Sequence, residues 1–150
     1  MTPANRHDNW LGGDPTQYRK GARYPAPEFG MYSTASDLFA FYQMMLNGGT
    51  YNGARILSRP AVEVMTTLQT GDLEEGGPSG MGYGLGWMVV RNALGSLGLK
   101  SVGAYGHIGA LGTAGWVDPK RDLVGILLIQ GGATDERNTF MTMAEAAIVD

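Results

Sequence analysis

The chain has 150 residues, 43% of them hydrophobic, and a formal net charge of −3, so it is long enough to bury a core as one domain. This acidic balance, without Lys or Arg runs between aromatics, argues against nucleic acid or an anionic membrane surface as a partner. Cys is absent, which excludes disulfides and thiolate chemistry, and no apolar run approaches the roughly 18 residues of a membrane-spanning helix.

Residues 1–29 hold four of the seven prolines and show no hydrophobic period, which predicts an irregular segment. Its aromatic residues indicate that it is nevertheless packed on a surface, because disordered segments are poor in such side chains. They are Trp10, Tyr18, Tyr24 and Phe29. The first residues contain no apolar segment of the secretory type, so the sequence leaves the compartment open.

Two capped helices are predicted next. Thr34 and Asp37 form a capping box, and Asn47-Gly48-Gly49 ends the first helix. Ser58 is the expected N-cap of the second helix, after an Asn52-Gly53 turn of type I′. The core-facing residues are expected to be Leu38, Phe41, Tyr42, Met45 and Leu46 in the first helix, followed by Ala61, Val62, Met65 and Leu68 in the second.

The segment 69–80 is acidic and glycine-rich, which predicts an exposed loop. After it, Gly82, Gly84 and Gly86 alternate with large side chains, which predicts one extended strand with a bare glycine face. A turn near residues 93–98 then leads to an extended segment at 101–110.

Asp118-Pro119 predicts a chain reversal, because Asp bonds to nearby backbone and Pro fixes the second turn position. The return segment, residues 123–129, is apolar throughout and is expected to be a strand buried on both faces. A final helix should begin at Thr134 or Asp135. Its buried side is expected to hold Phe140, Met143, Ala144, Ala147 and Ile148.

The predicted fold class is therefore α+β, a mostly antiparallel sheet with flanking helices, in a single domain over residues 1–150. One strand, at 101–110 or at 123–130, lacks an obvious neighbour. The chain should then be part of a larger sheet, or complete its sheet by association.

His107 is the candidate for chemistry, because it lies between Gly106 and Gly109, where small residues let a ligand approach. On local sequence alone a structural histidine is favoured over a catalytic one. A metal hydrolase using His7 and His107 is disfavoured, since no H-E-x-x-H spacing exists. No phosphate-binding glycine motif occurs either, and no cofactor or metal is predicted.

Several short motifs occur together in one order over residues 30–148. They are 31–38 (MYSTASDL), 44–49 (MMLNGG), 56–58 (ILS), 83–87 (YGLGW), 107–109 (HIG) and 115–119 (GWVDP). This series resembles the C-terminal half of the serine β-lactamase-like family, which includes class C β-lactamases, penicillin-binding D,D-peptidases, D-aminopeptidases and related esterases. The resemblance implies a partial β-lactamase/transpeptidase-like fold and bacterial proteins that are often periplasmic or secreted.

In that family an S-x-x-K serine is acylated, a Y-x-N or S-x-N motif follows, and a K-T-G or H-x-G motif lines the site. The resemblance gives His107 a role in orienting or protonating substrate and assisting proton transfer. It makes the Ala110 amide one oxyanion donor, and Gly109 would admit the acyl group, with Ile108 and Tyr83 beside the substrate.

The nucleophile motif is missing from this sequence. The three lysines are preceded at the required distance by Gln17, Leu97 and Val117, and no Y-x-N or S-x-N occurs. We therefore expect the C-terminal portion of a hydrolase acting on β-lactams, D-amino peptides or esters, inactive as an isolated chain. Its small acyl substrate would need the missing half. The alternative is a non-catalytic binding module that self-associates through an open sheet edge as a homo-oligomer.

Overall fold

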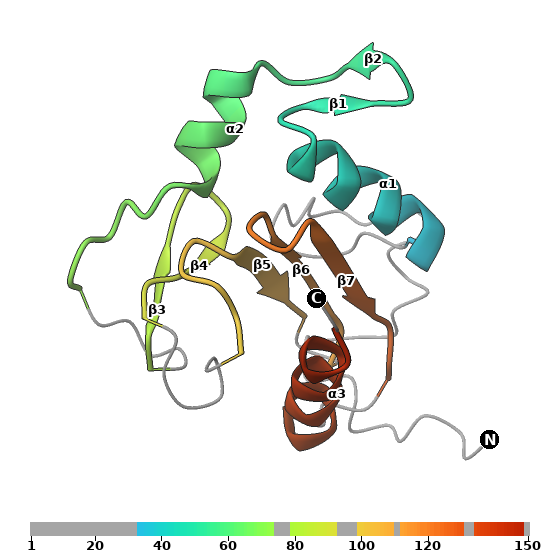
Figure 1. Cartoon of the computed structure of the whole chain (residues 1–150), viewed down its shortest axis with the longest axis vertical. Helices are drawn as coiled ribbons and strands as arrows, with labels where there is room; N and C mark the ends of the chain where they lie inside the picture. The colour runs from blue at the N-terminus through green and yellow to red at the C-terminus, as the bar shows by residue number, and fades with distance from the viewer. Residues whose placement is uncertain (1–32, 74–78, 93–98, 110–111, 131–133, 149–150) are drawn as a thin grey trace, which may run out of the picture.

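A computed structural model describes residues 33–73, 79–92, 99–109, 112–130 and 134–148 (Figure 1). The predicted N-terminal segment 1–29 and the turn at 93–98 lie outside the described residues. The helices are α1 (Ala35–Leu46), α2 (Arg59–Thr66) and α3 (Thr134–Ala146). A small hairpin joins β1 (Thr50–Tyr51) to β2 (Ala54–Arg55), and the main sheet is formed by β3 (Met81–Tyr83), β4 (Met88–Val90), β5 (Tyr105–Ile108), β6 (Ala114–Asp118) and β7 (Leu123–Leu127). The α+β prediction is confirmed.

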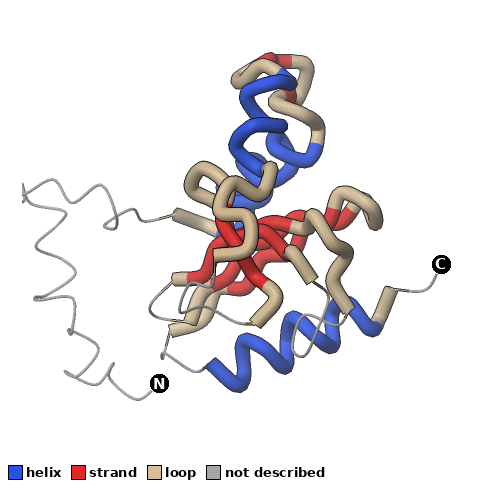
Figure 2. Tube along the Cα trace, turned by 90° about the vertical axis from the view of Figure 1, so that its left-hand side faces the viewer, coloured by secondary structure: helices blue, strands red, loops and turns tan. Residues whose placement is uncertain are grey.

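The five main strands are antiparallel in the order β3-β4-β5-β6-β7. Figure 2 shows the sheet between two helical layers, with α1 and α2 on one side and α3 on the other. The core fills the α1 side of the sheet. It comprises Tyr42, Met44, Met45, Val62, Trp87, Val89, Tyr105 and Val117.

The predicted helix boundaries are confirmed by their caps. Thr34 Oγ1 accepts the Asp37 amide at 3.1 Å, and Ser58 Oγ accepts the Ala61 amide at 3.2 Å. At the end of α1 the Gly49 amide reaches the Met44 carbonyl at 2.8 Å with φ of 97°, which satisfies a free carbonyl of the last turn. Local hydrogen bonding thus fixes both helices.

The turn predictions are confirmed as well. Asn52 and Gly53 have φ of 47° and 80°, the left-handed conformation that a type I′ hairpin requires. At the β6–β7 reversal, Asp118 Oδ1 accepts the Lys120 amide at 3.1 Å. The carboxylate thus forms the turn, as the Asp-Pro pair predicts.

The glycine alternation at 82–87 does not form one strand. The chain turns between β3 and β4, where Gly86 has φ of 80° and the Gly84 amide donates to the Trp87 carbonyl at 2.8 Å. The prediction of a single extended strand is wrong because a glycine spaced every second residue suits a tight hairpin as well as a strand.

The order of the strands decides two further predictions. The sequence left open which strand lacks a neighbour, the one at 101–110 or the one at 123–130. The first contains β5, which lies between β4 and β6, whereas the second contains β7, the last strand of the described sheet, so the second alternative is confirmed. β7 is half-buried throughout, whereas β6 is buried at all five positions. The prediction that the strand at 123–129 is buried on both faces is therefore wrong. The fully buried strand is its neighbour β6, because a strand at the edge of a sheet keeps one side exposed.

The buried side of α3 is also not the one predicted. Phe140, Met143 and Ile148 are 44%, 65% and 37% exposed, while Glu145 is only 4% exposed. In α1, similarly, Phe41 is exposed and Met44 is buried. The spacing of apolar residues along a helix shows which residues could pack against the sheet. In α3, however, Glu145 occupies the buried side, because it forms ion pairs there with Lys100 and Arg121.

Candidate functional site

His107 lies near the carboxyl end of β5, beyond the last residue that pairs with β4. Gly106 pairs with Met88, whereas His107 and Ile108 pair only with β6, opposite Gly115 and Ala114. The imidazole is exposed. The candidate catalytic group therefore lies at an accessible sheet position and is not packed in the core.

The imidazole lies on the α1 side of the sheet. Residues paired across an antiparallel ladder share a face, so His107 and Gly115 point the same way. A Cβ built on Gly115 would meet the ring of Tyr42, which belongs to α1. Gly115 thus lets α1 approach the sheet beside His107.

The imidazole is oriented by the backbone next to it. His107 Nδ1 lies 2.8 Å from the carbonyl oxygen of Ile108, which can only accept. In the neutral ring Nδ1 therefore carries the proton, and Nε2 keeps its lone pair. This arrangement leaves Nε2 able to take or return a proton.

Gly109 forms a tight turn immediately after the strand. Its amide donates to the Thr113 carbonyl at 2.8 Å, and the Gly112 amide donates back to the Gly109 carbonyl at 3.0 Å. A Cβ on Gly109 would collide with Thr113 Oγ1. Only glycine fits here because Thr113 fills the place of a side chain, and the Gly109 amide is already bonded and is no free oxyanion donor. Ala110, the predicted oxyanion donor, lies outside the described residues.

The structure does not bring the other predicted residues to the imidazole. Ile108 alternates with His107 and lines a pocket on the α3 side of the sheet. Tyr83 pairs with Met88, which pairs with Gly106, so Tyr83 lies two strands away and on the same face as Ile108. Neither side chain shares the face of the imidazole.

Aromatic rings form the wall behind His107. Trp87 contacts Tyr42 and Tyr105 edge to face at centroid distances of 5.5 and 5.2 Å, and Phe41 stacks on Trp87 at 5.8 Å. Burial raises the pKa of Tyr105 to about 12, so its hydroxyl stays protonated at neutral pH. Trp87 is 5% exposed and belongs to the core, while Phe41 is 45% exposed.

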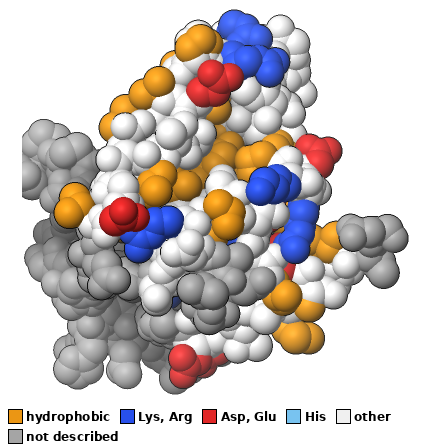
Figure 3. Space-filling model, turned by 60° about the vertical axis from the view of Figure 1, so that its left-hand side comes forward, with side chains coloured by type: hydrophobic (Ala, Val, Ile, Leu, Met, Phe, Trp, Pro, Cys, Tyr) orange, Lys and Arg blue, Asp and Glu red, His pale blue; other side chains and the backbone are white. Residues whose placement is uncertain are grey.

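The surface of the molecule also presents apolar side chains. Figure 3 shows hydrophobic side chains across the middle of one face, with acidic and basic groups interspersed around them. Exposed large apolar residues in this half of the chain include Phe41 and Leu85. Such surface is suited to contact with an apolar ligand or with further polypeptide.

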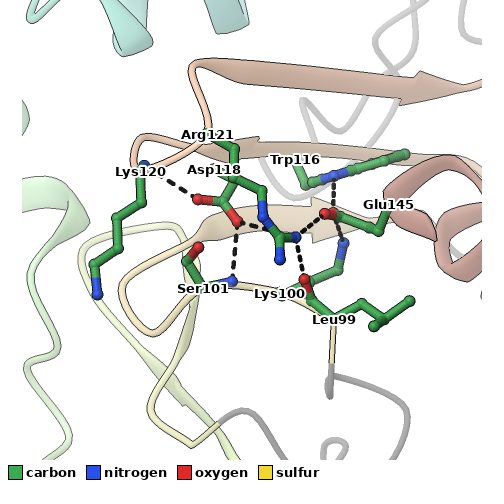
Figure 4. Close-up of polar contacts among 8 residues, drawn as sticks. All are labelled: Leu99, Lys100, Ser101, Trp116, Asp118, Lys120, Arg121 and Glu145. Atoms are coloured by element: carbon green, nitrogen blue, oxygen red, sulfur yellow. Dashed lines mark hydrogen bonds and ion pairs between the residues drawn. The ribbon is translucent and has the colours of Figure 1, made fainter. Parts of the chain in front are cut away.

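On the face of the sheet opposite to the His107 imidazole, the structure contains a buried ion cluster that the sequence analysis did not predict (Figure 4). Glu145 accepts Lys100 Nζ and Trp116 Nε1 at 2.8 Å, and Arg121 at 2.7 Å. Lys100 also lies 4.5 Å from the centre of the Trp116 ring. Desolvation lowers the pKa of Lys100, and the bond to Glu145 opposes that change. No local motif signals this cluster, because Glu145 is 24 to 45 residues away from its three partners along the chain.

No group of three His, Asp or Glu residues that could hold a metal occurs among the described residues, and His7 lies outside them. None of the described helices is long and apolar enough to cross a membrane.

Comparisons with known proteins place the fold. The Beta-lactamase family model matches residues 1–150. Protein Rv1367c of Mycobacterium tuberculosis is 36% identical over 111 residues, and "Putative D-alanyl-D-alanine carboxypeptidase" of Escherichia coli K12 is 32% identical over 104 residues. These alignments cover 67% and 66% of this chain, but only 28% and 22% of those proteins.

A solved structure agrees with the sequence matches. "Putative 6-aminohexanoate-dimer hydrolase from Bacillus anthracis" superimposes with a TM-score of 0.56 at 25% identity, over 76% of this chain and 27% of that one. The chain thus spans less than a third of the proteins that it matches. Because the family model covers its whole length, the chain belongs to the β-lactamase family.

Proposed function

We propose that this chain forms the histidine-bearing wall of a serine acyl-transfer site, whose nucleophile comes from polypeptide outside these residues. The observation that carries the proposal is the exposed His107 imidazole at the end of β5, with Nδ1 bonded to a carbonyl and Nε2 left with its lone pair. The substrate class is an acyl compound such as a β-lactam, a D-amino peptide or an ester.

The chemistry follows from what the chain holds and what its sequence lacks. His107 would move a proton during attack on the substrate carbonyl, and the Ala110 amide would be one donor to the oxyanion. No serine precedes a lysine by three residues in this sequence. The isolated chain is therefore expected to leave nitrocefin and p-nitrophenyl esters at the background rate.

A hybrid protein tests the role of His107. This chain would replace the C-terminal part of a serine β-lactamase-like protein that carries S-x-x-K, and hydrolysis of a p-nitrophenyl ester would be measured. We expect His107→Ala to lower kcat by about 100-fold or more, the usual contribution of a proton-transfer group. The matched control is Arg59→Ala, at an exposed position on α2. An active, folded hybrid whose kcat is the same with and without His107 would contradict the proposal.

A second function, a non-catalytic module that associates through its sheet edge, is favoured by one observation. β7 is the last strand of the described sheet and is half-buried along its length. An edge strand offers backbone hydrogen-bonding groups to another chain. Association of the isolated chain through this edge would support this second function without any catalytic group.

A further inference from the structure

A pocket of about 70 Å³ lies on the α3 side of the sheet, and its lining extends to His107 at the end of β5. Most of its wall is apolar, with contributions from Met88, Val90, Ile108, Trp116 and Met141. The polar residues of α3 that line it are Arg137 and Asn138, and Lys100 lines it from the other side. An apolar pocket with a few convergent polar groups is typical of a binding site for a small ligand.

Arg137 is the side chain of this pocket whose bonding is incomplete. Its Nε is buried and has no hydrogen-bond partner among the described residues. The described ion pairs are also made by other residues. Because a guanidinium stays charged in proteins, a buried N–H without an acceptor costs free energy. An acceptor inside the pocket would remove that cost.

The neighbouring carboxylates are already engaged. Glu145 receives Lys100 and Arg121, and its side chain is 0% exposed. Asp118 accepts the backbone amides of Ser101 and Lys120 in the β6–β7 turn. Neither carboxylate is bonded to Arg137, so the pocket keeps an excess of positive charge against an apolar wall.

We propose that this pocket binds a carboxylate carrying a short apolar tail, with Arg137 as the charged partner and Asn138 as a further donor. Its volume is about half that of the roughly 150 Å³ cavity that accommodates benzene in an engineered protein, which suits a tail of about three carbons. The carboxylate can come from a free small acid or from an acidic side chain of polypeptide that completes the fold.

The test follows the Arg137 Nε–H signal by ¹H–¹⁵N NMR while the 150-residue chain is titrated with sodium butyrate. We expect the chemical shift of this signal to change and to saturate, with a Kd in the millimolar range that is typical of a ligand with few atoms. Butanol and sodium chloride at the same concentrations should leave the signal in place. Binding to Arg137→Gln, followed by the Trp116 Nε1–H signal, should weaken at least tenfold, whereas Arg59→Gln on α2 should not change it.

Each outcome decides the proposal. Equal shifts with chloride and butyrate, or unchanged affinity in Arg137→Gln, would overturn it. If that variant does not fold, Met141→Trp fills the pocket, and continued butyrate binding there would overturn the proposal equally. The hybrid protein distinguishes the two sources of the carboxylate. If butyrate still binds there, the natural ligand is a free acid. If the Arg137 Nε–H signal of the hybrid already has the shift of the butyrate-bound chain, the ligand is an acidic side chain. Failure here leaves the role of His107 intact, because that role is tested by the kcat of the hybrid protein and not by butyrate binding.

Discussion

Two glycines of the main sheet determine how closely aromatic rings can approach its two faces. Gly115 pairs with His107 and faces Tyr42, whose ring occupies the place of a Cβ. On the other face, a Cβ on Gly125 would collide with the indole of Trp116. The two glycines therefore allow an aromatic ring to lie directly on the sheet on each side, one of them beside the candidate catalytic group.

Gly115→Ala should destabilise the fold by about 1–3 kcal/mol, the usual cost of adding a methyl group to a packed interior. The new Cβ would lie 2.7 Å from Tyr42 Cε2, and the ring is held between α1 and the sheet. Urea unfolding followed by circular dichroism measures the change. Gly82→Ala is the matched control, because the atoms its Cβ would meet are side-chain ends, those of Leu68 and Thr70, and no aromatic ring lies there. A loss equal to that of Gly115→Ala would contradict this account.

Helix and turn boundaries could be read from the sequence because local hydrogen bonds determine them. Thr34, Ser58 and Asp118 each bond within three residues, so the residues that define the motif are also those that form it. The buried side of α3 could not be read in this way. It depends on Lys100 and Arg121, which approach Glu145 only after the sheet has formed, so a charged residue replaced the expected apolar ones.

Glu145→Gln should destabilise the protein by about 3–5 kcal/mol, because removing one partner of a buried ion pair leaves the other charge uncompensated. Lys100 has an 8% exposed side chain and would lose its carboxylate, while a glutamine oxygen could still accept from Trp116. Urea unfolding provides the measurement. Glu136→Gln, at an exposed position on the same helix, is expected to change stability by less than about 0.5 kcal/mol, and similar losses in both variants would refute the ion-pair explanation.

For the whole molecule, the fold class and the position of His107 could be predicted, but the partners of His107 could not. The H-x-G motif placed the imidazole at the end of a strand, where the structure has it exposed. Tyr83 follows a glycine pattern that suits either a strand or a hairpin, and only the order β3-β4-β5 shows that it lies two strands from His107. Strand order is a long-range property, so short motifs do not determine it.

β7 is the outermost strand of the described sheet, and with the exposed apolar residues of α3 it predicts that the isolated chain associates as its concentration rises. Leu128, the residue directly after β7, is 43% exposed, and Met143 on α3 is 65% exposed. A charge on an edge strand opposes pairing with another chain, so Leu128→Lys should shift the protein toward monomer in size-exclusion chromatography with light scattering. Leu85→Lys, which is 53% exposed but lies in the β3–β4 turn, should leave association unchanged. A wild-type chain that remains monomeric at high concentration would instead mean that this edge is protected, and the acyl-transfer proposal would stand without the self-associating alternative.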